Sequence, residues 1–185
     1  GGRYFTNAID TRTRGIDVVG TWRLDLAAST LDLTAGYNHT KTEITRIAPN
    51  PEELEQSGLN LERIDRVEIG RIEVGFPRNK LLLGGTWTGQ AWTLAASTTR
   101  YGSVHTTPNN AALDQSYGAK WLLDLSASYR PDDRWTLTLG ADNVLNEYPD
   151  ENIFGNSTNG QFPYSNLSPF GFGGAFVYGR VGYSW

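Results

Sequence analysis

Hydrophobic and polar residues alternate along most of this chain, at the period of two that is typical of β-strands. Seven segments carry the alternation, and they are longer than the roughly five or six residues usual for strands of globular proteins. Turn-forming Gly, Pro, Asn and Asp residues separate them. The pattern predicts an all-β, antiparallel protein with strands near residues 11–27, 30–46, 79–88, 91–103, 119–130, 134–144 and 173–185.

The connections between these segments alternate strictly in length. Short connections fall at 27–30, 88–91 and 130–134, and long ones at 47–78, 104–118 and 145–172. In an antiparallel meander this order places every short turn at one end of the sheet and every long loop at the other. A soluble sandwich has no reason for such a bias.

Two features of the first long connection need an interpretation. The stretch "RVEIGRIEV" (66–74) looks like a strand, but an eighth strand there would move all later connections to the opposite end. We therefore assign it to the long loop. Earlier in this loop, Asn50 is an N-cap candidate, Pro51 suits the first helical position and glutamates follow, which predicts a short surface helix.

Sorting the segments by parity gives two contrasting faces. Within residues 16–26, 31–39, 81–87, 92–98, 121–129, 135–141 and 175–185, one face carries no formal charge. The opposite face of the strands carries Asp17, Arg23, Asp32, Lys120, Asp124 and Arg180 among others. A soluble β-sandwich also separates apolar and polar faces. The aromatic residues favour a different fold, because the apolar face has most of them near the short turns or the chain end: Trp22, Trp87, Trp92, Tyr129, Trp135, Tyr183 and Trp185.

A second aromatic pair, Tyr37 and Trp121, lies toward the long loops. At ~3.3 Å per residue and a tilt of ~40°, the two groups are roughly 20 Å apart, close to the ~25 Å apolar band between the aromatic girdles of transmembrane barrels. A lipid-facing charge costs about 2–4 kcal/mol at mid-bilayer, which explains the charge-free face. We predict an antiparallel transmembrane β-barrel fragment, with Trp185 in the periplasmic girdle and Arg180 in the lumen.

Composition narrows the function classes. The net charge of −4 and pI near 5.2 give no broad positive field, so we expect no nucleic-acid partner. The absence of cysteine excludes disulfides and thiolate metal sites. No apolar run approaches the roughly 20 residues that a membrane-spanning helix needs.

Several stretches resemble a known family. They are "TNAIDTRTRGIDVVGTW" (6–22), "GFPRNKLLLGGTW" (75–87), "LLDLSASYRPDDRWTLTLGADNVLNEYPD" (122–150) and "SPFGFGGAFVYGRVGYSW" (168–185). Together they resemble the C-terminal barrel of TonB-dependent outer-membrane receptors, and "DNVLNEYP" is the most specific of them. The ending matches the aromatic positions of the barrel-assembly signal at Tyr183 and Trp185, whereas Arg180 replaces its glycine.

The resemblance implies a 22-stranded barrel in the bacterial outer membrane, closed by an N-terminal plug domain. It implies uptake of a scarce ligand of the iron-siderophore, vitamin or glycan class. The implied partners are outer-membrane lipid, the small-molecule ligand and the inner-membrane TonB energy-coupling complex. We expect residues 1–185 to be the C-terminal portion of the barrel, about seven strands, with the plug domain outside this chain. "GRYFTN" is expected to belong to an earlier strand or to extend the first one.

Catalytic or metal chemistry has weak candidates. His39 and His105 are the only histidines, and we expect no catalytic residue, cofactor or metal. Asp142, Asn143, Glu147, Asp150 and Glu151 are compatible with a calcium site at a loop base, but their spacing is not that of an EF-hand, and a solvated loop fits them better. "GFGG" (171–174) lacks the spacing of a phosphate loop and is expected to be a flexible lead into the last strand.

The long loops are the expected place for ligand recognition, because a rigid scaffold holds them. The aromatic residues of 145–172 suit planar or sugar-like ligands, and the arginines of 47–78 suit carboxylate or phosphate groups. The alternative is that the rings pack loop against loop and the arginines pair with Glu62, Asp65, Glu68 and Glu73. The ligand-binding candidates are Arg63, Arg66, Arg71, Tyr148, Phe154, Phe162, Tyr164 and Phe170.

The sequence thus predicts an energised transporter and not an enzyme. Two alternatives remain at this point: a passive, porin-like barrel, and an outer-membrane enzyme or adhesin. The enzyme would need a lumen cluster of Ser, His and acid, and no such cluster is visible in the sequence.

Overall fold

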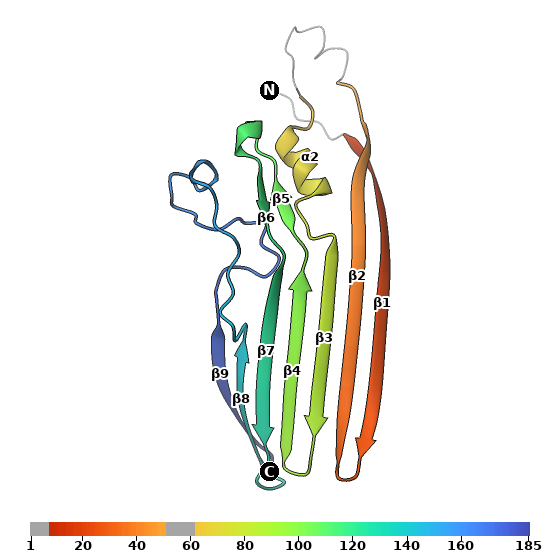
Figure 1. Ribbon diagram of the computed structural model, residues 1–185, viewed down its shortest axis with the longest axis vertical. Helices are drawn as coiled ribbons and strands as arrows, with labels where there is room; N and C mark the ends of the chain where they lie inside the picture. Colours follow the sequence, from red (N-terminus) through yellow and green to blue (C-terminus); the bar gives the residue numbers. More distant parts are fainter. Residues whose placement is uncertain (1–7, 51–61) are drawn as a thin grey trace.

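A computed structural model describes residues 8–50 and 62–185 of the chain. Seven long strands form one antiparallel sheet in the order β1-β2-β3-β4-β7-β8-β9, and the two short strands β5 and β6 form a separate hairpin (Figure 1). Within these described ranges, no helix has both the length and the apolar character that crossing a membrane requires.

The seven predicted strands are confirmed with small changes at their ends. The last one, predicted from residue 173, begins three residues later because Gly171 and Gly174 adopt positive φ angles of 73° and 69°. The strands are β1 (Ile9–Leu26), β2 (Ser29–Ile47), β3 (Asn79–Thr88), β4 (Trp92–Tyr101), β7 (Lys120–Tyr129), β8 (Trp135–Asp142) and β9 (Phe176–Tyr183).

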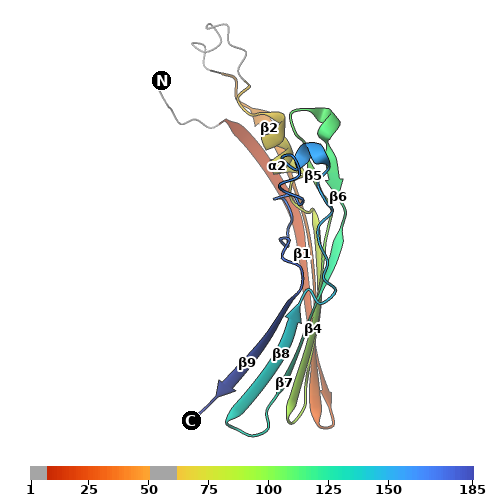
Figure 2. The same cartoon turned by 90° about the vertical axis from the view of Figure 1, so that its left-hand side faces the viewer.

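The alternation of connection lengths is also confirmed. The turns β1–β2, β3–β4 and β7–β8 lie together with the C-terminus at one end of the sheet, and the long connections lie at the other (Figure 1). Seen from the side, the sheet is bent, and β9 and β1 point away from each other at the short-turn end (Figure 2). This is the curvature of a segment of barrel wall.

Strand register confirms the predicted faces. Residues of the charge-free face lie opposite one another on neighbouring strands. One row of such paired residues crosses the whole sheet. It runs Trp22↔Leu33↔Gly85↔Ala96↔Leu125↔Ala141↔Val177. The neighbouring row on the opposite face contains Arg23, Asp32 and Ser126.

In residues 8–50 and 62–185, no second layer of protein covers the apolar face. Leu139 and Val181 are 65% and 67% exposed, and Val104 and Tyr117, both outside this sheet, are the buried hydrophobic residues of the described chain. A soluble sandwich would bury this face under a second sheet. The structure therefore excludes the sandwich alternative for these strands.

Polar and aromatic side chains bound the apolar band. At the short-turn end, ring centroids lie 4.6 Å apart for Trp92 and Tyr129 and 4.8 Å apart for Trp135 and Tyr183. At the other end the Tyr37 hydroxyl donates to Asn79 Oδ1 over 2.8 Å. Beyond Asn79, where the pairing of β2 with β3 ends, β1 and β2 continue as a pair. The next residues of this pair that point outward are Arg14 and Lys41.

The long connections contain structure that the sequence interpretation did not predict. Residues 66–74, which look strand-like, form helix α2 (Arg66–Glu73), although their assignment to the long loop is confirmed. The connection 104–118, expected to be plain loop, contains β5 (Val104–Thr106), the 3-10 helix η1 (Ala111–Leu113) and β6 (Gln115–Tyr117). A second 3-10 helix, η2 (Phe154–Asn156), lies in the last connection. The helix expected after Asn50 falls in 51–61, outside the described residues.

Candidate functional site

Helix α2 is fixed between the sheet and the β5–β6 hairpin. Its N-cap is Asp65, whose carboxylate accepts the Glu68 N–H over 2.9 Å. Glu73 Oε1 accepts the Ile44 N–H of β2 over 2.8 Å, and the carbonyl of Val74 accepts the His105 N–H of β5 over 3.0 Å. These bonds position one wall of the long-loop end.

The predicted arginines lie on or beside α2. The Arg66 guanidinium makes a bidentate ion pair with Asp114, at 2.6 and 2.5 Å, and donates to the carbonyl of Pro108. The Arg66 guanidinium lowers the pKa of the Asp114 carboxyl, chiefly through this hydrogen bond. Arg71 pairs with Glu68 over 2.8 Å, as the alternative to ligand contact expected, and Arg63 is half-buried at the bend before Asp65.

The "DNVLNEYP" stretch ties three strands together where β8 ends. Asn143 has a φ of 50°, and its amide both donates to and accepts from the backbone of Glu147, at 2.8 and 2.9 Å. The Asn143 N–H donates to Asp124 Oδ1 of β7 over 2.7 Å. Asn146, with a φ of 56°, accepts the Ala175 N–H just before β9 over 3.0 Å. Asparagine suits both positions because it tolerates positive φ and bonds the local backbone.

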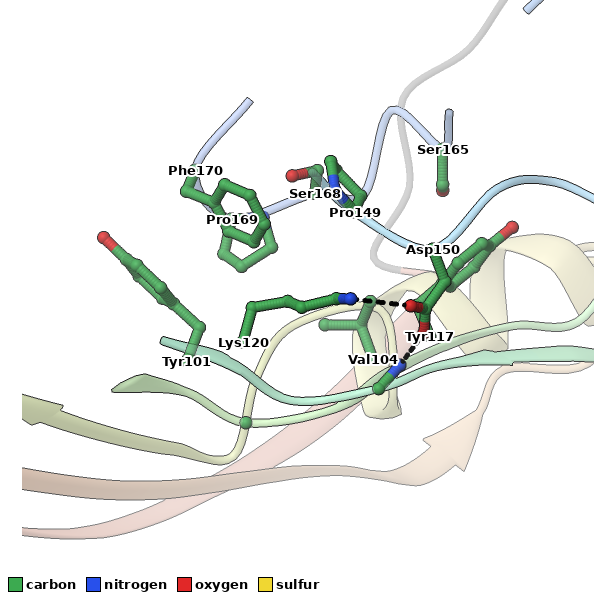
Figure 3. Close-up of a pocket in the computed structure, with 12 residues that line it drawn as sticks. Tyr101, Val104, Tyr117, Lys120, Pro149, Asp150, Ser165, Ser168, Pro169 and Phe170 are labelled. Atoms are coloured by element: carbon green, nitrogen blue, oxygen red, sulfur yellow. Dashed lines mark hydrogen bonds and ion pairs between the residues drawn. The ribbon is translucent and has the colours of Figure 1, made fainter. Parts of the chain in front are cut away.

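Asp150 fastens the last long connection to the start of β7. Its carboxylate accepts the Gly118 N–H over 2.5 Å and pairs with the Lys120 ammonium over 2.9 Å (Figure 3). The Gly118 N–H, followed by Lys120, lowers the pKa of Asp150. The cavity in Figure 3 is only about 10 Å³, about the space of one water. It is a packed junction that holds the loop in place.

The aromatic residues of this connection divide into three settings. The rings of Tyr148 and Tyr164 stack at 5.7 Å, and those of Tyr164 and Phe172 stack at 6.2 Å, so Tyr164 lies between two near-parallel rings. Phe170 packs against Tyr101 of β4 at 5.7 Å. Phe154 and Phe162 are 73% and 61% exposed.

An open groove of about 620 Å³ lies among α2, the β5–β6 hairpin and the 145–172 connection. Its lining includes the rings of Phe162, Tyr164 and Phe172, the amides of Asn152, Asn156 and Asn166, and Val67 of α2. No charged side chain lines it within the part of the chain that the structure describes. We take this groove, called the loop groove below, as the candidate ligand site.

The loop groove contains only part of the predicted set. Phe162 and Tyr164 line it, Tyr148 stacks behind Tyr164, and Phe154, Phe170 and the arginines are not among its lining residues. Sequence reasoning missed Phe172, because "GFGG" was interpreted only as a lead into the strand. It also missed the amide-bearing Asn152 and Asn156, which no spacing pattern singles out.

The residues considered for metal binding or catalysis do not come together in one site. In residues 8–50 and 62–185 no group of three or more His, Asp or Glu side chains is placed to hold a metal ion. Of the acidic cluster weighed for calcium, Asp150 is held by Gly118 and Lys120. His39 contacts Asn79 on the outward face, and His105 contacts Ser116 Oγ in the hairpin at 2.7 Å.

Comparison with known protein families decides the assignment. The model of the family described as TonB dependent receptor-like, beta-barrel, matches residues 1–144. The chain belongs to this family. It is therefore part of the β-barrel of a TonB-dependent receptor of the Gram-negative outer membrane, and the fold and location predicted from the sequence are confirmed.

Solved structures agree on the fold. The ferripyoverdine receptor of the outer membrane of Pseudomonas aeruginosa, bound to ferripyoverdine, is 18% identical with a TM-score of 0.50, covering 76% of this chain and 16% of its own. The copper transporter OprC is 15% identical with a TM-score of 0.53, covering 96% of this chain and 24% of its own. The chain thus spans less than a quarter of the length of these two proteins. No curated protein sequence matches it.

The Asp150 anchor of this TonB-dependent receptor barrel predicts a pH effect. The pKa of Asp150 lies below its ordinary value of 3.8, so its contribution to docking is complete above pH 3.8 and is lost as pH falls through the lowered pKa. In the full receptor, Asp150→Asn should speed pepsin cleavage of the 145–172 connection by about threefold near pH 4.5. The unchanged receptor and the Asp150→Asn variant should be cleaved at the same rate once the pH drops below the lowered pKa of Asp150, because both side chains are then neutral. Equal rates at all pH values would show that Asp150 does not hold the loop.

Proposed function

We propose that the full protein is an energy-coupled outer-membrane transporter whose extracellular loops capture a scarce small molecule. The observation that carries this proposal is the match of residues 1–144 to the receptor barrel family. The arrangement of the chain supports it, because the helix and the hairpin outside the main sheet lie at the long-loop end. There α2, the β5–β6 hairpin and the 145–172 connection surround the loop groove.

We also propose that residues 1–185 are the C-terminal part of a larger barrel with a plug domain encoded upstream. The support is physical: β1 and β9 are the edges of the sheet in the described chain, and an unpaired strand edge is not tolerated in lipid. Further strands must therefore pair with these edges in the membrane. Energy from the inner-membrane TonB complex would reach the plug, so that partner acts outside this chain.

Uptake measurements test the transport step. Cells carrying the full-length receptor should grow on its ligand at limiting concentration, and deleting the inner-membrane energising complex should reduce uptake to the level of cells without the receptor. The control is growth at a high ligand concentration, which passive diffusion supports in both strains. Uptake at the limiting concentration that persists after the deletion would instead identify a passive, porin-like barrel.

A further inference from the structure

We propose that the loop groove binds a neutral, polyhydroxylated ligand of the oligosaccharide class. The inference rests on the proposed function and narrows the ligand that the receptor captures. Three properties of the groove lead to it: its charge, its aromatic surface and its fixed geometry.

The charge of the groove disfavours anionic ligands. None of its described lining residues carries a charge at neutral pH, and the lining includes amides, hydroxyls and aromatic rings. The two cations of α2, the helix that carries the lining residue Val67, are already paired, Arg66 with Asp114 and Arg71 with Glu68. An anionic chelate bound here would lose hydration without gaining a cationic partner, which is unfavourable.

The aromatic surface suits the apolar faces of sugar rings. Tyr164 and Phe172 are near-parallel, with 21° between their planes, and Phe172 keeps 57% of its surface exposed. The negative face of an aromatic ring attracts the weakly positive C–H groups on one face of a pyranose. The Nδ2 atom of Asn156 donates to Leu113 O and to Gln115 Oε1, so its Oδ1 is the atom of this amide that a ligand hydroxyl would meet. Asn152 Oδ1 accepts the Tyr117 hydroxyl and has one further lone pair to accept a ligand hydroxyl.

The groove is also held in shape before any ligand binds. Tyr117 at its base is 4% exposed and donates its hydroxyl to Asn152 Oδ1 over 2.7 Å. Ser157, 2% exposed, accepts the Gly160 N–H and donates to the carbonyl of Phe154 at the turn beside it. A preformed site loses less conformational entropy on binding, so rings and amides already in place favour affinity for a ligand that fits them.

Binding to the purified full-length receptor in detergent tests the proposal. The probes are a panel of immobilised neutral oligosaccharides (α-glucans, β-glucans, xylans, mannans and galactans) and ferric citrate as an anionic chelate. We expect at least one neutral oligosaccharide to bind and ferric citrate not to bind. The affinity for that oligosaccharide, measured by calorimetry, should be the same in about 0.05 M and about 0.5 M salt, because no charge pair contributes.

Matched phenylalanine variants locate the site. Phe172→Ala should weaken oligosaccharide binding about tenfold, because it removes the exposed stacking ring. Phe76→Ala is the control: this ring lies between α2 and β3 and is 69% exposed but does not line the groove, so affinity should change less than about twofold. Binding of ferric citrate that weakens in Phe172→Ala, or no oligosaccharide binding across the panel, would overturn the proposal.

This result is independent of the transport test. Binding in detergent needs no energy coupling, so oligosaccharide binding with uptake that survives loss of the energising complex would contradict only the proposed function. Energy-dependent uptake of an anionic chelate, with no oligosaccharide bound, would contradict only the ligand assignment.

Discussion

Leu125→Arg is expected to prevent stable insertion of the receptor into the outer membrane. Leu125 lies on the charge-free face of β7, midway between Trp121 and Tyr129, and pairs with Ala96 and Ala141. An arginine at the middle of the bilayer costs about 2–4 kcal/mol, and no lumen or loop group is on that face to offset it. Loss of the heat-resistant, fast-migrating barrel form of the full receptor in gel electrophoresis is the measurement.

The adjacent residue provides the control. Ser126 points to the opposite face, where it shares a groove with Asp124 and Asp142, so Ser126→Arg should insert normally. Leu139→Arg and Thr138→Arg form a second matched pair on β8, with the same expected difference. Normal migration of both leucine variants would contradict the assignment of this face to lipid.

Gly70→Ala is expected to detach α2 from the β5–β6 hairpin while leaving the barrel intact. A Cβ atom on Gly70 would lie 1.7 Å from Thr107 Oγ1 and 2.9 Å from Thr107 Cβ, so one element must move. Away from such a contact, glycine to alanine in a helix stabilises it by roughly 0.5–1 kcal/mol. If α2 packs against Thr107, Gly70→Ala should therefore destabilise the docked helix. If it does not, the same change should stabilise the helix through its higher helix propensity.

Limited proteolysis of the full receptor measures this detachment. Cleavage in the 62–78 region should rise about tenfold in Gly70→Ala, the change that a loss of about 1.4 kcal/mol of docking free energy would produce. Thr107→Gly in the same chain removes the clashing atoms and should restore protection. Gly36→Ala, whose Cβ would meet no heavy atom closer than 3.9 Å, should leave cleavage unchanged. Unaltered protection in Gly70→Ala would mean that α2 does not pack against Thr107.

The strands and their faces were predictable because lipid imposes a simple rule on every outward side chain. Every second residue of each strand faces lipid, so apolar residues recur at positions such as Leu123, Leu125 and Ala127. This alternation can be recognised from the strand's own sequence, without knowing which distant residues it contacts. The same holds for the aromatic positions near the turns, which depend on distance along a strand.

The loop end was less predictable because its contacts join residues far apart in sequence. "RVEIGRIE" alternates like a strand, and only the Asp65 cap and the Gly70–Thr107 contact show why it is a helix. Arg66 pairs with Asp114, 48 residues away, and not with the neighbouring acids weighed from sequence. Strands β5 and β6 have three residues each, too few for an alternating pattern. The roles of Arg63, Phe154 and Phe170 in ligand binding stay predictions.

The strands of this part of the barrel wall have unequal lengths, so the long-loop end of the sheet is uneven. Beyond the last β2–β3 pair, His39↔Asn79, strand β2 continues to Ile47 and stays paired with β1. At ~3.3 Å per residue this extension is roughly 25 Å long. It stands on the opposite side of α2 from the 145–172 connection (Figure 1). In this part of the barrel wall, the β1–β2 extension therefore projects beyond β3 on one side of α2, and the connection that carries Phe162 and Phe172 lies on the other side (Figure 1).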